Sequence, residues 1–260
     1  MKVVILCGGQ GTRIRDVADD IPKPMIPLGR YPILWHIMKY YSSWNHHDFI
    51  LCLGYKGQVV KDFFLNYETH TRDFTIDFST SRGITFHDDH AESNWRITCA
   101  DTGLKAMTGA RVRNIRKYLG DEKEFFLTYG DGVGDVDLDR LLAFHRSHGR
   151  IMTVTGVRPP GRFGEIMCET GGKVTEFNEK PQASGGRISG GFFVCRRELF
   201  EYLPEGDDLV FEVEPMRALV RAGQMMVYEH DGFWQPMDTA RDFQLLNGLV
   251  AQGKAPWIRW

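Results

Sequence analysis

The stretch Val3-Val4-Ile5-Leu6-Cys7, followed by Gly8-Gly9-Gln10-Gly11-Thr12-Arg13, decides how the rest of the chain is interpreted. The first part is a short, β-branched apolar run, which is typical of a buried strand. The glycines that follow let backbone N–H groups approach an anion, because no Cβ stands in the way. Together they predict a strand that ends in a loop for a nucleoside triphosphate, with Arg13 and Lys23 as cations beside it.

Two better-known phosphate loops do not match this stretch. A dinucleotide-binding fingerprint needs glycine where Ile14 stands, and a P-loop needs Gly-Lys-Ser/Thr after four spacer residues. On the glycines alone, a tight strand-to-helix turn is an equal alternative. The Thr12-Arg13 pair and the lysine in Pro22-Lys23-Pro24 favour an anion site.

The bulk composition limits the class of protein. The 260 residues suffice for one large domain with a full core. A formal charge of −2 argues against nucleic acid as the main partner, since phosphate backbones attract basic domains. No apolar run approaches the ~18 residues of a membrane span, and the five scattered cysteines lack metal-ligand spacing. We therefore expect a cytoplasmic protein with reduced thiols and no membrane partner.

Strand-like and helix-like segments alternate in the first half of the chain. The expected strands are 2–7, 49–53 and 125–129, the region 73–100 is β-rich, and the expected helices are 32–44, 57–67, 108–118 and 137–148. Such alternation is typical of βαβ units in a mostly parallel sheet.

The sequence pattern changes beyond residue 150, where short expected strands are separated by glycine-rich turns. Strands are expected at 151–156, 164–168, 173–177, 187–195 and 225–229, and helices at 196–203, 211–222 and 238–252. We predict an α/β fold with a Rossmann-like mixed, mostly parallel sheet flanked by helices, and a smaller β-rich part. Residues 1–150 would bind the nucleotide and residues 151–260 the other substrate, within one compact catalytic domain.

Two acids are candidate metal ligands. Asp131, in Gly130-Asp131-Gly132, follows the strand 125–129 at the end where a parallel sheet binds ligands. Asp238 lies at the start of the last expected helix. Taken singly, the first fits an Asp-Gly turn and the second a helix N-cap, with Thr239 as the other candidate cap. Together with substrate phosphates they make a suitable Mg²⁺ site.

Two further motifs lie in the second half of the chain. In Glu179-Lys180-Pro181, the proline holds Lys180 in extended geometry, where it can bind a phosphate while Glu179 accepts sugar hydroxyls. A solvated Glu-Lys pair in a turn is the alternative. Ser189-Gly190-Gly191 opens another strand and permits close approach of a ligand.

The motifs favour group transfer between phosphates. No Gly-x-Ser-x-Gly stretch supports covalent acyl chemistry. Nucleotidyl transfer needs positioning and charge neutralisation, which the cations and acids above supply. A glycosyltransferase is a rival because Asp135-Val136-Asp137 is a D-x-D triplet, although Asp137 fits a helix cap better. A non-catalytic sensor of nucleotide sugars is a second rival.

These motifs, in their order and spacing, resemble the sugar-1-phosphate nucleotidyltransferases. The segments that carry the resemblance are Leu6–Arg13, Lys23-Pro24-Met25, Tyr129–Gly132, Glu179-Lys180-Pro181 and Trp234–Thr239. The branch of the family that is most similar joins CTP to α-D-glucose 1-phosphate. The resemblance implies Mg²⁺-dependent formation of CDP-glucose and pyrophosphate, for deoxysugar and O-antigen precursors, by a homo-oligomer that is a hexamer in this branch.

The resemblance also implies roles for individual residues. Arg13, Lys23 and Lys180 would be catalytic, and Asp131 and Asp238 would hold Mg²⁺. The sugar phosphate would contact Glu179, Lys180, Ser189, Gly190 and Gly191. The nucleotide would contact Leu6, Gly8, Gly9, Gly11, Thr12, Arg13, Lys23, Thr102, Gly103, Arg111, Thr128 and Gly130. Ser189 replaces the usual Asn beside the sugar pocket, so another sugar 1-phosphate stays open as an alternative. The same chemistry with UTP or dTTP in place of CTP is a further alternative.

Overall fold

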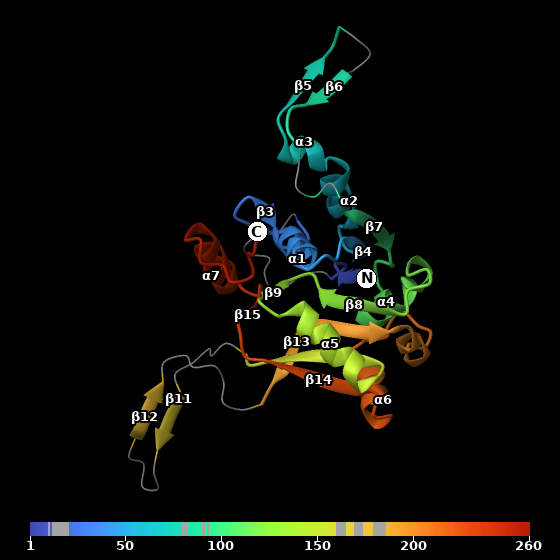
Figure 1. The fold of residues 1–260 in the computed structure, drawn as a ribbon, viewed down its shortest axis with the longest axis vertical. Coiled ribbons are helices and arrows are strands. Elements are labelled where there is room, and N and C mark those ends of the chain that lie inside the picture. The colour runs from blue at the N-terminus through green and yellow to red at the C-terminus, as the bar shows by residue number, and fades with distance from the viewer. Residues whose placement is uncertain are drawn as a thin grey trace.

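A seven-stranded sheet in the order β14-β10-β13-β8-β1-β4-β7 runs through the protein (Figure 1). The structure is a computed structural model that describes residues 1–9, 11, 21–79, 83–89, 92, 94–159, 165–168, 174–178 and 186–260, with backbone alone at 165–168 and 174–178. The sheet strands are β1 (Lys2–Leu6), β4 (Asp48–Leu53), β7 (Arg96–Asp101), β8 (Glu124–Tyr129), β10 (Met152–Val157), β13 (Ile188–Arg196) and β14 (Met225–His230).

The other elements are short strands and flanking helices. The strands are β2 (Pro27–Leu28), β3 (Tyr31–Pro32), β5 (Phe74–Asp77), β6 (Gly83–Phe86), β9 (Gly132–Gly134), β11 (Glu165–Cys168), β12 (Val174–Asn178) and β15 (Trp234–Pro236). The α-helices are α1 (Ile33–Ser42), α2 (Gly57–Leu65), α3 (Tyr67–Thr71), α4 (Thr108–Asn114), α5 (Leu138–His148), α6 (Glu214–Arg221) and α7 (Ala240–Ala251). Short 3₁₀ helices are η2 (Lys23–Met25), η3 (Arg116–Tyr118) and η4 (Arg197–Tyr202). Two hairpins, β5–β6 and β11–β12, project from the body at opposite ends (Figure 1).

The apolar run at the start of the chain is buried on both faces of the sheet. Strand β1 pairs in parallel with β4 on one side and β8 on the other. Val3 and Ile5 pack in the cluster that holds α1, whereas Val4 and Leu6 pack in the cluster that holds α4. Alternate side chains of a strand point to opposite faces, so a continuous apolar run is what a doubly covered strand requires. The predicted α/β fold with a mostly parallel mixed sheet is confirmed.

One reversed strand, β13, brings the second half of the chain to the carboxyl edge of the parallel strands. Strand β13 is antiparallel to both β8 and β10, while β14 is parallel to β10. All strands of the seven-stranded sheet except β13 therefore run in one direction. The amino end of β13, with Gly190 and Gly191, lies beside the carboxyl end of β8. The ring of Tyr129 occupies the space where a Cβ of Gly191 would be, and Gly191 has φ +75.

Most predicted elements are confirmed, with three differences in detail. The helix expected at 57–67 is broken into α2 and α3, and the one expected at 108–118 is α4 followed by η3. The segment expected as a helix at 196–203 is the 3₁₀ helix η4. Cys7, Cys52, Cys99 and Cys195 are free thiols. Among the described residues, no helix has both the length and the apolar composition needed to cross a bilayer.

The last helix begins with a capping box. The Thr239 hydroxyl accepts a hydrogen bond from the Asp242 N–H, and the Asp242 carboxylate accepts one from the Thr239 N–H. These bonds satisfy N–H groups that have no partner within the helix. Of the two candidate caps at this helix, Thr239 is the one used, so the carboxylate of Asp238 is left for another role.

We predict that Thr239→Ala lowers the free energy of unfolding by about 1 kcal/mol, the usual effect of losing a hydroxyl cap. Urea denaturation followed by circular dichroism measures the change. Thr239→Ser keeps the hydroxyl and should stay close to wild type. Equal stability of the Ala variant and wild type would contradict the role of this cap.

Candidate active site

The glycine-rich loop begins where β1 meets β8 at the carboxyl edge of the sheet. The Gly130 N–H donates to the carbonyl oxygen of Leu6 at 3.0 Å. A Cβ at Gly130 would lie 2.8 Å from that oxygen and 3.2 Å from Cγ of Pro24. Gly11 has φ +59, and a Cβ there would lie 3.1 Å from Cβ of Lys23. Glycine is therefore needed at these positions to bring the loop, the end of β8 and the Lys23 segment together.

Arg111 ties this loop to the two neighbouring strand ends. Its side chain projects from α4 and is 5% exposed. One guanidinium nitrogen, Nη1, donates to the carbonyl oxygens of Leu53 and Gly103 and to Oγ1 of Thr102, at 2.8–2.9 Å. The other, Nη2, donates to the carbonyl oxygen of Gly8 at 3.0 Å. Burial lowers the pKa of the Arg111 guanidinium, but an arginine keeps its charge in proteins.

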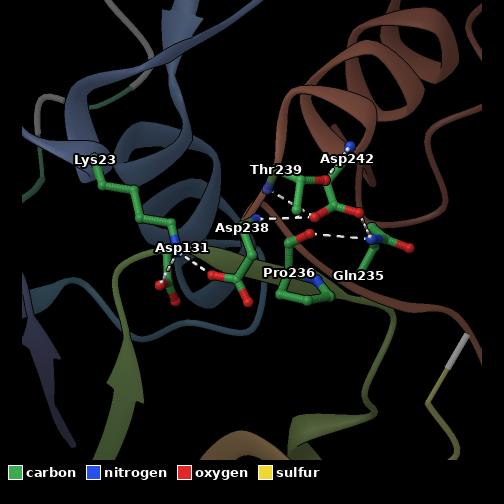
Figure 2. Close-up of polar contacts among 7 residues, drawn as sticks. All are labelled: Lys23, Asp131, Gln235, Pro236, Asp238, Thr239 and Asp242. Atoms are coloured by element: carbon green, nitrogen blue, oxygen red, sulfur yellow. Dashed lines mark hydrogen bonds and ion pairs between the residues drawn. The ribbon is translucent and has the colours of Figure 1, made fainter. Parts of the chain in front are cut away.

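Lys23 lies between the two predicted metal ligands (Figure 2). Its Nζ atom donates to Oδ2 of Asp131 at 2.7 Å and also contacts Oδ1 of Asp238. The lysine side chain is 12% exposed, and the two aspartates are 34% and 29% exposed. Burial alone would lower the pKa of Lys23, but Asp131 and Asp238 outweigh burial and raise that pKa above its usual value. The lysine is therefore a fixed positive charge near neutral pH.

A short β-ladder explains why the two aspartates meet although they are far apart in the sequence. Strand β9, directly after Asp131, pairs with β15, directly before Met237. The Met237 N–H donates to the carbonyl oxygen of Asp131 at 2.8 Å. Asp242 accepts hydrogen bonds from the N–H groups of Asp238 and Thr239 at 3.0 and 2.9 Å, so the backbone of Asp238 is held in place while its carboxylate faces Lys23 (Figure 2).

These groups line a cavity of about 790 Å³ at the carboxyl edge of the sheet. This volume is within the usual range of small-molecule sites. Of the predicted residues, the lining includes Leu6, Gly8, Gly9, Gly11, Lys23, Arg111, Gly130, Asp131 and Asp238. The structure thus brings most of the predicted nucleotide and metal residues together around one space.

The other predicted residues do not line this cavity or fall outside the described part of the chain. Thr102 is buried and donates its hydroxyl to the Leu53 carbonyl, and Thr128 is buried within β8. The carbonyl oxygen of Gly103 accepts a hydrogen bond from Arg111. Ser189–Gly191 lie on β13, where Gly191 packs against the ring of Tyr129. Thr12, Arg13, Glu179 and Lys180 lie outside the described residues, so their roles stay predictions from the resemblance.

One wall of the cavity was not predicted as a site. Leu104, Lys105, Ala106, Met107, Thr108 and Tyr129 belong to the lining. Tyr129 donates its hydroxyl to one oxygen of Glu212, and Thr108 donates to the other at 2.7 Å. Glu212 therefore fixes two parts of the wall that lie far apart in the sequence. The sequence signals near this wall were Gly103 and Arg111, predicted as nucleotide contacts, and the segment Tyr129–Gly132, which carries part of the resemblance.

The donor set at Lys23 fits a divalent metal. Two carboxylates point at one place, and a cation, the ammonium of Lys23, lies between them. Mg²⁺ takes oxygen ligands and commonly uses one or two carboxylates together with substrate phosphates and water. In the described part of the chain, no group of three or more His, Cys, Asp or Glu residues is placed to hold a metal. A metal held by the aspartate pair would therefore need further ligands from a substrate.

The two aspartates of the D-x-D triplet make contacts within the fold. The Asp137 side chain accepts from the Arg140 N–H at 2.9 Å and caps α5. Asp135 lies 2.9 Å from Nε2 of His230. Neither residue lines the cavity of about 790 Å³, which removes the observation that favoured a glycosyltransferase.

A second and larger cavity, of about 1,300 Å³, lies at the opposite edge of the sheet. It is lined by amino ends of strands, such as Lys2 and Glu124, and by acids and bases in similar number, including the Arg146–Glu124 pair at 2.9 Å. None of the predicted site residues lies there. Parallel sheets bind ligands at the carboxyl ends of their strands, so the smaller cavity is the candidate active site.

The fold and this site define a nucleotide-transferring enzyme, and the comparison with known families agrees. The chain belongs to the nucleotidyl transferase family, whose sequence model matches residues 2–247.

Two relatives match this chain over its whole length. The chain is 45% identical to the glucose-1-phosphate cytidylyltransferase of Salmonella typhi and 42% identical to the probable glucose-1-phosphate cytidylyltransferase of Bacillus subtilis. Both matches extend over 260 residues and cover 100% of each chain. Among solved structures, HddC from Yersinia pseudotuberculosis matches with a TM-score of 0.69 at 21% identity and covers 96% of this chain and 99% of its own. This likeness supports the fold.

We predict that Gly8→Ala destabilises the free protein by about 1–3 kcal/mol, the effect of disrupting hydrogen bonds of a buried charged group. A Cβ at Gly8 would clash with the Arg111 guanidinium, which its four hydrogen bonds hold in place. A Cβ at Gly9 would meet nothing within 4 Å, so Gly9→Ala is the matched control. Thermal unfolding without ligand measures the stability of both variants. Equal losses of stability would contradict the tight packing of Arg111 against Gly8.

Proposed function

We propose that this chain transfers the cytidylyl group of CTP to α-D-glucose 1-phosphate, giving CDP-glucose and pyrophosphate. The observation that carries the proposal is the full-length match, at 45% and 42% identity, to proteins named as glucose-1-phosphate cytidylyltransferases. Mannose-1-phosphate guanyltransferases are more distant. That of Gibberella zeae is 27% identical, and the match spans 62% of its length.

The nucleotide would bind in the cavity of about 790 Å³. The glycine-rich loop offers backbone N–H groups to the phosphates, and Gly9 has open space on the side where a Cβ would stand. Lys23 would supply a largely buried positive charge for the triphosphate. Arg111 cannot reach far into the cavity, because its guanidinium is already bonded to four protein oxygens. Its role is to fix the loop and the ends of β4 and β7 around the base.

The chemistry follows from the charges of the substrates. A phosphate oxygen of the sugar 1-phosphate is already an anion, so it needs no general base. It forms a new bond to the α-phosphorus of CTP while the bond from that phosphorus to the bridging oxygen breaks, and pyrophosphate leaves with the electron pair. The protein holds the two anions in line and offsets their repulsion, with Lys23 and, by resemblance, Arg13 and Lys180 as the cations.

Asp131 and Asp238 would hold Mg²⁺, which supplies charge neutralisation at the phosphates when it is bound. Ser189, Gly190 and Gly191 would border the sugar, since β13 reaches the same edge of the sheet as the end of β8. We also propose a homo-oligomer in the cytoplasm, as expected from the resemblance. Residues 1–150 and 151–260 would serve the nucleotide and the sugar phosphate respectively.

Nucleotide choice tests the proposal directly. With Mg²⁺ and glucose 1-phosphate, we expect pyrophosphate release with CTP to exceed release with UTP, dTTP, ATP and GTP by about 10-fold or more, because a site built for the N4 donor of cytosine leaves a buried group unpaired with other bases. A coupled phosphate assay measures release. Preference for another nucleotide would overturn the base assignment, and no release with any of them would contradict the proposed reaction.

We predict that Asp131→Asn lowers kcat by about 100-fold or more, as expected when a group that stabilises charge at a reacting phosphate is lost. Asp139, which is exposed on α5, provides the control Asp139→Asn. Circular dichroism checks that both variants keep the fold. Turnover of Asp131→Asn within a few-fold of the control would contradict a role of this aspartate in the reaction.

A further inference from the structure

Lys23 occupies the place where a metal between the two aspartates would lie. Its ammonium contacts one oxygen of Asp131 and one of Asp238 at the same time (Figure 2). A lysine ammonium and a divalent cation compete for the same carboxylate oxygens. The arrangement in the free protein is therefore a carboxylate pair whose negative charge is already partly neutralised by a side chain of the protein.

The aspartates alone are a weak site for a metal that must first displace this ammonium. Two carboxylates supply only part of the ligands that Mg²⁺ prefers. No third acid, histidine or cysteine joins them among the residues that the structure describes. If metal entered without nucleotide, the displaced ammonium would remain in a largely buried place beside a second cation, which is unfavourable.

A bound triphosphate changes this balance. Lys23 lines the same cavity as the glycine-rich loop, so its flexible side chain can exchange the carboxylates for phosphate oxygens. The phosphates also offer the missing ligands for the metal. When both the metal and the triphosphate are bound, each cation has anionic partners. If only one of them bound, one charge would be left without a partner.

We propose that Lys23 is an exchangeable counter-ion of the Asp131–Asp238 pair and makes metal and triphosphate bind cooperatively. The inference rests on the proposed function, because it takes the two aspartates as the metal site. It gives Lys23 a role before the chemical step: in the free protein it occupies the carboxylate pair, and it moves to the triphosphate when metal enters. Coupling is reciprocal, so nucleotide strengthens metal binding as much as metal strengthens nucleotide binding.

The first test measures Mn²⁺ binding to the nucleotide-free protein by electron paramagnetic resonance. Lys23→Met keeps an unbranched side chain, one heavy atom shorter, but removes the competing charge, so we expect it to bind Mn²⁺ about 10-fold more tightly than wild type, within the usual range of coupling between sites. Lys105→Met is the matched control, since Lys105 is exposed and lines the same cavity. Its Mn²⁺ affinity should change less than about 2-fold if general charge effects are small there. Unchanged or weaker Mn²⁺ binding by folded Lys23→Met, or an equal gain in the control, would overturn the proposal.

The second test measures the affinity for CTP by calorimetry, in EDTA and with saturating Mg²⁺. In wild type we expect Mg²⁺ to strengthen CTP binding, and we expect this gain to shrink several-fold in Lys23→Met, because exchange no longer couples the two ligands. A gain of equal size in both proteins would contradict the exchange. Lys23→Gln repeats both tests in case the Met variant does not fold.

Asp131→Asn separates this inference from the function on which it rests. If Asp131→Asn leaves Mn²⁺ binding unchanged, the aspartates are not the metal site, and both the metal assignment and the exchange fail. If Asp131→Asn abolishes Mn²⁺ binding while Lys23→Met does not strengthen it, the metal site stands and only the exchange is refuted.

Discussion

Two carboxylates that face one point repel each other unless a cation lies between them, and the active-site edge of this protein is built around that constraint. Asp131 and Asp238 meet because β9 pairs with β15 and because the Met237 N–H bonds to the Asp131 carbonyl. The 3₁₀ helix η2 places Lys23 between them. The backbone thus brings like charges together, and a single lysine makes that arrangement tolerable.

The remaining parts of the site hold the backbone around this centre. Arg111 uses its four hydrogen bonds to join the glycine-rich loop with the ends of β4 and β7. Glu212 joins Tyr129 to Thr108 on another wall. These bonds around the cavity involve charged groups, and charge-assisted hydrogen bonds are stronger than neutral ones and fix geometry.

Features that depend on local sequence could be predicted. The strand at the start of the chain, the glycines after it and the acid after β8 follow from apolar runs and from the chemistry of their neighbours. The cap of α7 could not be assigned between Asp238 and Thr239, because both residue types cap helices and only the bond from the Asp242 N–H distinguishes them. The cavity wall around Met107 and the partner of Tyr129 at Glu212 were missed, since they depend on contacts between distant segments.

The wide separation of Lys23 from its partners also bears on how the protein acquires its site during synthesis. The two ion pairs join positions 108 and 215 residues apart. Contacts of such long range form only after large loops have closed, which takes more conformational entropy than forming a local turn. A growing chain can pair β1 with β4 once residue 53 has been made, but it lacks the second carboxylate until the segment before α7 has been made. The site is therefore completed only when nearly the whole chain is present, so a truncated product is left without it.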